Sequence, residues 1–377
     1  MRFHWFLPTT GDSRAIVGGG HGLHRGHGHP TASVYRPPSI DYLGQIARSA
    51  EQLGFEAVLT PTGTFCEDAW LVTAALTQVT TRLKFLVAFR PGFLSPTLAA
   101  QMAATYQRIS GGRLLLNVVT GGEATEQKRF GDHLSKDERY ARTDEFLTVV
   151  RGAWDGPFDF AGEHYRVEGA MVAERPSPVP ELYFGGSSPA AGPVAARHVN
   201  VYLTWGEPPS QVAAKLGWIR ELAAAEGRTL RFGIRLHVIT RDTSQEAWAE
   251  ADRLLDRIDP EDIASARTIL GRSESAGQQR MLALHEGFRG GRARDLEIHP
   301  GLWAGVGLVR GGAGTALVGS HAEVADLVEE YASLGIEEFV LSGYPHLEEA
   351  YWFGEGVLPE LRRRGALDRA PAVRLTA

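Results

Sequence analysis

The clearest strand signal in the sequence is the run Leu114-Leu115-Leu116-Asn117-Val118-Val119. Apolar side chains fall on both faces of this run, as in a parallel strand that is covered on both sides. Similar short runs of apolar or β-branched residues recur along the chain and complete a set of eight candidate strands. We expect these strands at Phe3–Leu7, Ala57–Thr60, Leu83–Phe89, Leu114–Val119, Leu182–Phe184, Val201–Thr204, Phe232–Ile239 and Phe339–Leu341.

Amphipathic patterns of helical period separate these strands. Strands that alternate with helices favour βαβ units, and eight of them predict an α/β fold that closes into a (β/α)8 (TIM) barrel. The reactive face of such a barrel lies at the carboxyl ends of its strands. We expect the main helices at Ile40–Leu53, Leu71–Gln78, Thr97–Arg108, Asp137–Trp154, Pro209–Glu226 and Ala322–Leu334.

Two interruptions of this alternation follow strand ends and should overhang the reactive face. Residues 13–38 form a loop rich in glycine and histidine. Residues 245–301 combine a helical pattern with a segment rich in glycine and arginine, and we predict that this insertion is a mobile lid, with disorder as the alternative. Otherwise residues 1–377 should form one domain, since α/β barrels often exceed ~250 residues undivided.

The charge balance argues against nucleic acids and membrane surfaces as partners. The 39 Lys and Arg residues against 45 Asp and Glu residues give a net charge of −6, whereas phosphate-rich partners need concentrated positive charge. A small organic anion needs only a few well-placed arginines. No apolar run approaches the ~20 residues of a membrane span, and the first strand is too short for a signal peptide. We therefore predict a cytoplasmic protein.

A turn rich in glycine and serine follows the fifth predicted strand. In Gly185-Gly186-Ser187-Ser188, the glycines bare backbone N–H groups and the serines add hydroxyl donors at the start of a helix. Barrels often hold a phosphate at this place. The alternative is an ordinary strand-to-helix turn with a serine cap.

Arg235 and His237 are two residues apart on the seventh predicted strand, so their side chains share one face. Pointing into a barrel mouth, they would form an anion site with a titratable neighbour. The alternative is a buried salt bridge or a solvated outer position. The lone Cys66 could be a nucleophile, a hydrogen-bond donor beside a cofactor, or a packing residue, and most lone cysteines are packing residues.

Neither a metal site nor a dinucleotide site is expected. The histidines at 21, 24, 27 and 29 lie among glycines that do not preorganise them, and no carboxylate accompanies them. The glycines near residues 305–312 lack the strand, phosphate loop, helix and distal acid of a Rossmann site. The chain should therefore not bind NAD(P)H in such a site.

Several long motifs resemble the alkanesulfonate monooxygenase branch of the bacterial luciferase-like flavin enzymes. They span nearly the whole chain, and they lie at Trp5–Thr9, Pro61–Gly63, Cys66–Trp70, Leu182–Ser188, Tyr202–Pro209, Arg231–Ile239, Leu302–Gly319 and Leu341–Ala350.

The resemblance implies a (β/α)8 barrel that takes reduced FMN from a separate NAD(P)H-dependent flavin reductase. With O2, similar enzymes cleave an organosulfonate into sulfite and an aldehyde. They form homodimers or homotetramers, and we expect at least a dimer. The absence of a Rossmann site agrees with a reductase that is a separate protein.

The resemblance also assigns roles to single residues of this sequence. Arg235 and His237 would hold the anionic substrate, and Arg310 would add a further cation. Tyr344 would donate a hydrogen bond to the flavin or the substrate. Cys66 would lie near the flavin. The implied FMN-binding residues are Asn117 and Thr120 beside the ring system, with Tyr140, Gly186, Ser187 and Ser188 at the phosphate.

This sequence departs from the family pattern at three places. It has Thr10 where the family has a histidine, Thr64-Phe65 where the family has Arg-Ser, and a longer loop at residues 13–38. We therefore expect an altered substrate, such as a bulkier or sugar sulfonate, or a different compound altogether. The alternatives are N-hydroxylation, oxidation of another sulfur compound, or a non-catalytic flavin-binding barrel; the cationic residues argue against the last.

Overall fold

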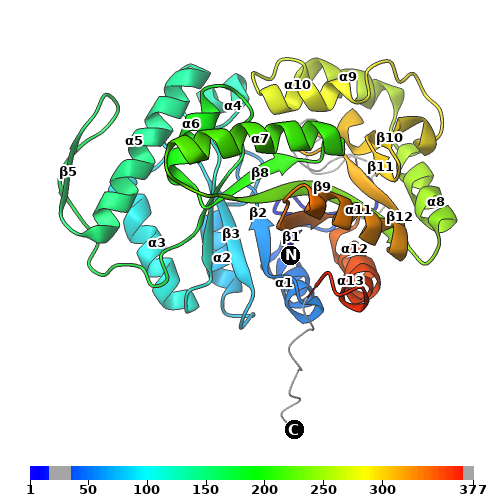
Figure 1. Cartoon of the computed structure of the whole chain (residues 1–377), viewed down its shortest axis with the longest axis horizontal. Helices are drawn as coiled ribbons and strands as arrows, with labels where there is room; N and C mark the ends of the chain where they lie inside the picture. The colour runs from blue at the N-terminus through cyan, green and yellow to red at the C-terminus, as the bar shows by residue number, and fades with distance from the viewer. Residues whose placement is uncertain (17–34, 368–377) are drawn as a thin grey trace, which may run out of the picture.

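A closed barrel of eight parallel strands forms the centre of the computed structural model, which describes residues 1–16 and 35–367 (Figure 1). Each strand pairs with its neighbours, and β9 closes the ring by pairing with both β8 and β13. All eight predicted strands are confirmed. They are β1 (Arg2–Phe6), β2 (Ala57–Thr60), β3 (Lys84–Phe89), β4 (Leu114–Val118), β7 (Leu182–Phe184), β8 (Val201–Trp205), β9 (Arg231–Arg241) and β13 (Glu338–Ser342).

The six predicted helices are also present and pack around the barrel. Serine or aspartate side chains cap many of their first turns; Ser135 and Glu138 form a reciprocal capping box at the start of α5, for example. The predicted helices are α1 (Ile40–Leu53), α2 (Ala69–Leu76), α3 (Pro96–Ser110), α5 (Lys136–Asp155), α7 (Pro209–Ala225) and α11 (His321–Ser333). Shorter ones are α4 (Ala124–Arg129), α6 (Ala191–His198), α12 (His346–Trp352), η3 (Phe353–Val357) and α13 (Leu358–Arg363).

Apolar side chains fill the inside of the barrel, as in a packed core rather than a pore. Near the amino ends of the strands this core contains a small polar group. There Glu338 Oε2 lies 2.9 Å from His4 Nε2 and accepts a hydrogen bond of 2.8 Å from the Tyr183 hydroxyl. A charge so deeply buried is tolerable only because these groups surround it. The carboxyl ends of the strands are left as the face that can hold a ligand.

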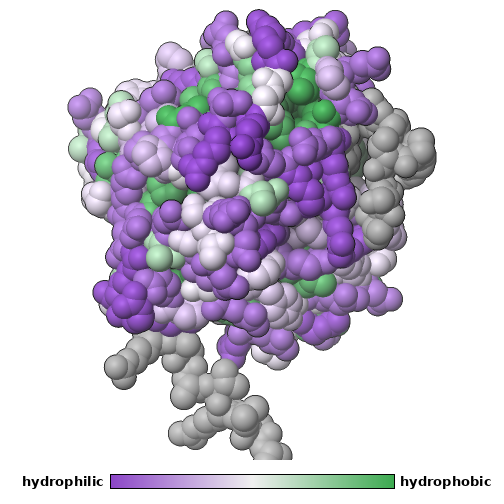
Figure 2. Space-filling model, turned by 90° about the vertical axis from the view of Figure 1, so that its right-hand side faces the viewer, coloured by the Kyte–Doolittle hydropathy of each residue, from purple (hydrophilic) through white to green (hydrophobic). Residues whose placement is uncertain are grey.

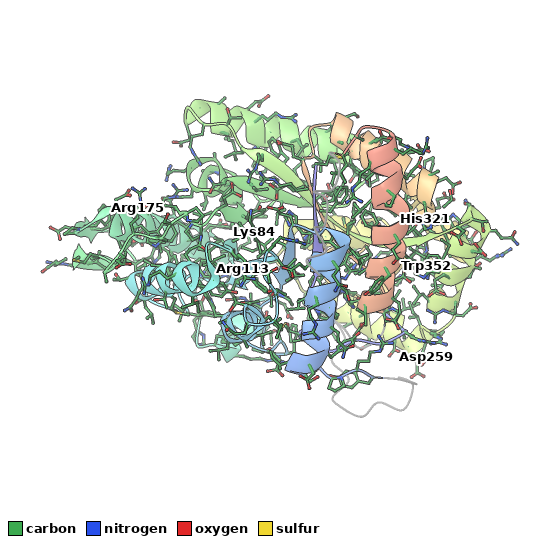
Figure 3. The ribbon with its side chains drawn as sticks, turned by 90° about the horizontal axis from the view of Figure 1, so that it is seen from below. Lys84, Arg113, Arg175, Asp259, His321 and Trp352 are labelled. Atoms are coloured by element: carbon green, nitrogen blue, oxygen red, sulfur yellow. The ribbon has the colours of Figure 1, made fainter. Side chains whose placement is uncertain are left out.

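The sequence did not reveal the length of β9, which has 11 residues. Its first half pairs with β8, while residues from His237 to Arg241 pair with β12, so a small extension grows from the barrel wall. Arg241 at its end lies over the ring of Trp352. The Trp352 ring stacks against that of His321, and both residues are labelled in Figure 3. The added strands are β10 (Glu297–His299), β11 (Leu302–Trp303) and β12 (Ala316–Ser320), with η2 (Gly305–Leu308) between the last two. A separate hairpin of β5 (Phe158–Ala161) and β6 (Arg166–Ala170) projects beside α5 (Figure 1).

The insertion at residues 245–301 is largely helical. α8 packs against β9 and β12 around a second hydrophobic cluster, whereas α9 and α10 lie at the top of the view in Figure 1. The face seen in Figure 2 is mostly hydrophilic, with apolar side chains gathered near its upper edge. Whether the insertion moves as a lid stays a prediction. Its helices are α8 (Ser244–Leu255), α9 (Pro260–Leu270), α10 (Ala276–Ala283) and η1 (Ala293–Leu296).

The insertion predicted at residues 13–38 falls largely on residues 17–34, which lie outside the described part of the chain. The segments on its two sides meet each other, because Asp12 and Arg36 exchange two backbone hydrogen bonds of 2.9 and 2.8 Å. Within the described residues, no helix is long and apolar enough to cross a membrane.

Candidate active site

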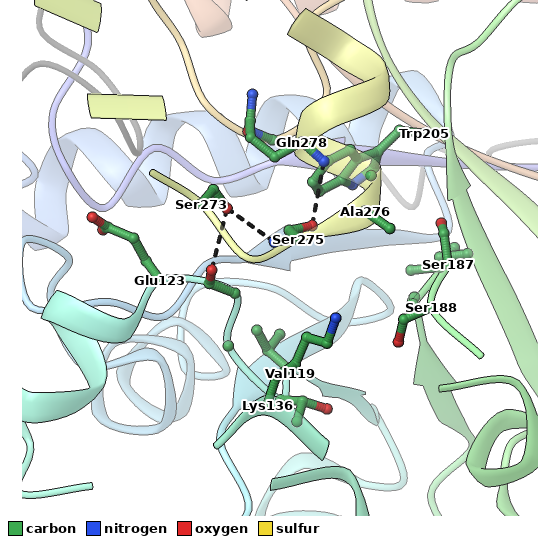
Figure 4. A pocket seen from close by; sticks show the side chains of 18 of the residues that line it. Val119, Glu123, Lys136, Ser187, Ser188, Trp205, Ser273, Ser275, Ala276 and Gln278 are labelled. Atoms are coloured by element: carbon green, nitrogen blue, oxygen red, sulfur yellow. Dashed lines mark hydrogen bonds between the residues drawn. The ribbon is translucent and has the colours of Figure 1, made fainter. Parts of the chain in front are cut away.

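A cavity opens at the carboxyl ends of the strands, where the barrel fold leads us to expect a site (Figure 4). The empty space within its walls and mouth is about 1190 Å³, a volume that includes open solvent at the mouth. Loops after β4, β7 and β8 form its floor and sides, and α5 contributes two side chains. The segment between α9 and α10 covers it from above. The wall includes Arg90, Thr120, Lys136, Tyr140, Gly186, Ser187, Ser188, Trp205, Gln278 and Gly312.

One end of the cavity offers hydrogen-bond donors without acceptors. The backbone N–H groups of Gly186, Ser187 and Ser188 make no hydrogen bond within the described residues. Their loop is fixed from behind, because the Tyr202 hydroxyl donates to the Gly186 carbonyl at 2.6 Å. A side chain at Gly186 would come within 2.6 Å of Ala191, so this backbone must stay bare. Free N–H groups beside serine hydroxyls form a typical anion site.

Two residues from the start of α5 complete this end. Tyr140 is largely buried, and burial raises its pKa, a rise that the neighbouring Ser188 hydroxyl opposes. Lys136 is half-buried, lines the cavity, and makes no ion pair within the parts of the chain described here. Figure 4 shows its side chain extending into the space below Ser275 and beside Ser188. An ammonium group next to bare N–H groups suits a phosphate.

A second group of polar residues lies where the end of β13 pairs with β9, outside the cavity wall, and forms what we call the cationic cluster: Arg235, His237, Arg310 and Tyr344. Arg310 Nη1 donates to the Tyr344 hydroxyl at 2.8 Å and lies 3.0 Å from His237 Nε2. The rings of His237 and Tyr344 stack with centroids 5.4 Å apart. All four residues are buried.

Ser342 and Phe6 connect Arg235 to the other members of the cluster. The Ser342 hydroxyl accepts from Arg235 Nη2 at 2.9 Å and lies 2.8 Å from His237 Nδ1. Both guanidinium groups of the cluster lie over the Phe6 ring, at 4.7 Å for Arg235 and 5.3 Å for Arg310. Neither arginine forms an ion pair with a carboxylate in residues 1–16 or 35–367. The two arginines of the cluster are therefore buried cations whose charge no carboxylate of the described residues compensates.

The protonation states of the cluster follow from these contacts. Burial, and then the nearby charges of Arg310 and Arg235, lower the pKa of His237 well below its usual value, so the ring is neutral at pH 7. Because a guanidinium can only donate, His237 Nε2 must accept and Nδ1 carries the proton. Burial raises the pKa of Tyr344, which stays a phenol. Burial, with the charge of Arg310, lowers the pKa of Arg235 to about 9, so it remains cationic at pH 7.

Asp12 and His346 support the cluster from the side of the first strand. Asp12 accepts from the backbone N–H of His346 at 2.8 Å, and its other oxygen lies 2.9 Å from His346 Nδ1. The Tyr42 hydroxyl also donates to Asp12, at 2.5 Å. The His346 ring meets the Tyr344 ring edge-on, with centroids 5.2 Å apart. His346 lies within the motif at Leu341–Ala350, but the sequence alone indicates no role for it.

Two buried ion pairs in the cavity wall were also missed. Arg90 Nη2 and Glu126 Oε2 are 2.5 Å apart, with both side chains almost fully buried. Lys215 Nζ lies 2.8 Å from Glu207 Oε1 and 2.8 Å from the Thr204 hydroxyl. A signal was available for Arg90, because it is a charged residue at the carboxyl end of an apolar strand. Lys136 gave none, since a lysine at a helix start usually lies in solvent.

The structure brings most of the predicted residues into two groups. Five of the residues assigned to the cofactor line the cavity, and four assigned to the substrate form the cationic cluster. Asn117 is half-buried on β4, but it is not part of the cavity wall. Cys66 lies in the turn after β2, where the charges of Arg90, Glu126 and Arg310 act on it, and burial raises its thiol pKa to about 12. The five cavity residues are Thr120, Tyr140, Gly186, Ser187 and Ser188.

No group of three or more potential metal ligands occurs within the described residues. The histidines at 21, 24, 27 and 29 lie outside that part of the chain.

Comparison with known families identifies the relationship. Residues 1–338 match the family model described as luciferase-like monooxygenase. The chain belongs to this family. It is therefore a flavin-dependent luciferase-like monooxygenase, as the sequence motifs indicated. The comparisons do not connect it specifically with the alkanesulfonate branch.

Solved structures of this fold have varied substrates. A riboflavin lyase with modified FMN matches at 24% identity and a TM-score of 0.77, over 98% of this chain and 94% of that chain. A long-chain alkane monooxygenase matches at 20% identity and a TM-score of 0.77, over 98% and 93%. The EDTA monooxygenase of Chelativorans sp. BNC1 matches at 20% identity and a TM-score of 0.74, over 98% and 95%. Other matches are F420-dependent, so the fold accommodates either FMN or F420.

Proposed function

We propose that this luciferase-like monooxygenase uses reduced FMN and O2 to oxygenate a small organic anion, with an organosulfonate as the favoured substrate class. A separate NAD(P)H-dependent flavin reductase would supply the reduced FMN. In the overall reaction the C–S bond breaks, and one oxygen atom of O2 enters the aldehyde while the other enters water. The two hydrogens that reduced FMN delivers are balanced by the water, and the hydrogen that the carbon loses is balanced by sulfur leaving as hydrogen sulfite.

The observation that carries this proposal is the pair of buried, unpaired arginines in the cationic cluster. A buried cation is costly unless an anion compensates it. Arg235 and Arg310 share the Phe6 ring and have no carboxylate partner within the described residues. A sulfonate would supply the missing negative charge, and its oxygens suit the donor geometry of guanidinium groups.

The free donors at the other end of the cavity support FMN as the cofactor. The FMN phosphate would accept from the N–H groups of Gly186, Ser187 and Ser188, and from Lys136. Thr120, with a buried hydroxyl oxygen that lacks a partner, would face the ring system. FMN supplies the electrons that reduce O2, and the protein determines where the anion lies beside it.

The neutral members of the cluster would handle hydrogen bonds and protons. Because Tyr344 accepts from Arg310, its own hydroxyl proton is free to be donated to the substrate. His237 is neutral with Nδ1 protonated, so it orients Arg310 without adding a third charge. The covered position of the cluster excludes water, and this strengthens each of these interactions.

Sulfite release tests the proposal. The purified protein would receive FMN, NADH, a flavin reductase and sulfonates ranging from methyl to sugar and aryl compounds. We expect at least one member to yield sulfite and an aldehyde in equal amounts, and none without reductase. Photoreduced FMN in place of the reductase should restore the reaction. If no member yields sulfite while another class of anion stimulates oxygenation, the sulfonate assignment is wrong.

A second candidate is oxygenation of an anion other than a sulfonate. Thr64 stands where the family has a cation, and its backbone N–H donates to Glu126 at 2.9 Å. The site edge therefore has one positive charge fewer than the family pattern, which would suit a less strongly acidic substrate such as a carboxylate. A panel of carboxylates in the same assay, read by oxygen consumption against hydrogen peroxide release, distinguishes the two.

A further inference from the structure

Gln278 is a buried amide whose two ends have different surroundings. It lies in the first turn of α10, lines the cavity, and is only 4% exposed. Its Oε1 accepts from the backbone N–H of Gly312 at 2.9 Å. Its Nε2 is buried and makes no hydrogen bond with any residue that the structure describes. A buried amide that lacks a partner is unfavourable, so a donor in a cavity wall indicates a place for a ligand acceptor.

The Gly312 contact connects the cavity with the cationic cluster. Gly312 also lines the cavity and follows Arg310 by two residues. Its φ of +87° is a conformation that favours glycine, so the loop takes a defined turn at this point. The short loop from Arg310 to Gly312 is fixed at both ends. Arg310 contacts His237 and Tyr344, and Gly312 contacts Gln278.

The neighbouring glutamine shows that this arrangement is not general for α10. Gln279 is exposed, does not line the cavity, and donates through Nε2 to the carbonyls of Ser273 and Gly271. Two adjacent residues of the same type thus differ in burial, in partners and in access to the cavity. Gln279 is therefore a matched control for Gln278.

We propose that Gln278 is a positioning residue that couples occupancy of the cavity to the placement of Arg310. Its Nε2 donates to the bound cofactor, and the amide then keeps Oε1 aimed at the Gly312 N–H. Flavin binding would in this way hold the Arg310 loop in the position that receives the anion. The inference rests on the proposed function only in taking FMN as the molecule in the cavity.

Hydrogen exchange with FMN as the probe tests this coupling without any turnover. In the wild-type protein we expect FMN to slow exchange both in α10 and in the segment from Val309 to Thr315. Gln278→Leu, which removes both contacts, should speed exchange of that segment and abolish its response to FMN at saturation. Gln278→Glu keeps an acceptor for the Gly312 N–H but cannot donate, so it should retain the basal protection and lose the FMN response.

FMN affinity gives the second readout, because loss of one hydrogen bond weakens binding by about fivefold to tenfold. Both Gln278 variants should show this loss, and Gln279→Ala should match the wild type in affinity and exchange. If Gln278→Leu responds to FMN as Gln279→Ala does, the coupling is refuted while the proposed function stands. If the wild-type protein binds neither FMN nor, under anaerobic conditions, reduced FMN, both are refuted.

Discussion

The cationic cluster and the donor end of the cavity are built on opposite plans. In the cluster, side chains from β9, the loop before β12 and the end of β13 hydrogen-bond to one another: Arg310 to His237 and Tyr344, and Arg235 to Ser342. At the donor end, the N–H groups of Gly186, Ser187 and Ser188 have no acceptor among residues 1–16 and 35–367. The cluster is largely hydrogen-bonded within itself, with Arg310 Nε as an exception among the described residues, and it lacks a negative charge, whereas the donor end lacks hydrogen-bond partners.

This difference indicates which ligand each region receives. A phosphate that binds and leaves with its flavin needs many donors and little rearrangement. A reacting anion needs charges held in place before it arrives, because preorganised charges give most of the electrostatic gain in catalysis. Substitutions in the two regions should therefore fail in different assays.

The largest expected effect comes from removing a charge in the cluster. Arg310→Ala should lower kcat/KM for the best substrate by about 100-fold to 1,000-fold, since one preorganised cationic donor is lost. FMN affinity, read from protein fluorescence, should stay within about twofold because Arg310 lies outside the cavity wall. Equal loss of both quantities would mean that Arg310 is a structural residue. Arg294→Ala, an exposed arginine on η1, is the control.

A smaller effect should follow from Lys136→Met at the donor end. We expect the Kd for FMN to rise by about tenfold, because a charge-assisted contact with the phosphate is lost. The Kd for riboflavin, which has no phosphate, should not change. Lys128→Met, at an exposed site on α4, tests for a general charge effect. A parallel loss for riboflavin would place Lys136 beside the ring system instead of the phosphate.

The neutral His237 should appear in the pH dependence of stability. Burial and the charges of Arg310 and Arg235 lower the pKa of His237 in the folded protein. In mildly acidic solution the imidazole therefore binds a proton in the unfolded chain but not in the folded one. Stability is therefore lost as pH falls below about 6.5, by up to about 1.4 kcal/mol per pH unit. His346 shifts in the same direction. The free energy of unfolding, measured by urea unfolding between pH 7 and pH 5, should fall less steeply with decreasing pH in His237→Asn than in the wild type. An unchanged pH dependence would contradict the assignment.

The smallest effect is expected at Cys66, which belongs to neither region. With its thiol pKa raised to about 12, mainly by burial, Cys66 is protonated at neutral pH and is no nucleophile. Cys66→Ser should therefore change kcat by less than about threefold. Iodoacetamide should modify the thiol slowly at pH 8 and faster as the pH rises toward 10. Rapid modification at pH 7 would show that the thiolate is present after all.

The sequence was informative about the barrel because its strands carry local signals. The run at Leu114–Val119 is apolar on both faces wherever it is placed, and period-two spacing put Arg235 and His237 on one face. The contact of Arg310 with His237 joins residues 73 positions apart, so spacing could not reveal it. The family resemblance supplied Arg310 and Tyr344 instead.

Other features had no local signal at all. The pairing of β12 with the outer half of β9 depends on where β8 ends, which no pattern in β9 records. Lys136 resembles any lysine at a helix start. Gln278 and Gln279 look alike in sequence, and only packing separates a buried amide from an exposed one. Such residues become visible when the polar atoms in the cavity wall are matched to partners.

The central claim is that the two regions bind different parts of one reaction, the cavity the flavin and the cationic cluster the anion. A crystal structure with FMN and octanesulfonate tests it most directly. We expect the phosphate on the N–H groups of Gly186–Ser188 with Lys136, and the sulfonate on Arg235 and Arg310. A sulfonate bound at the donor end, or a phosphate on the two arginines, would contradict the account.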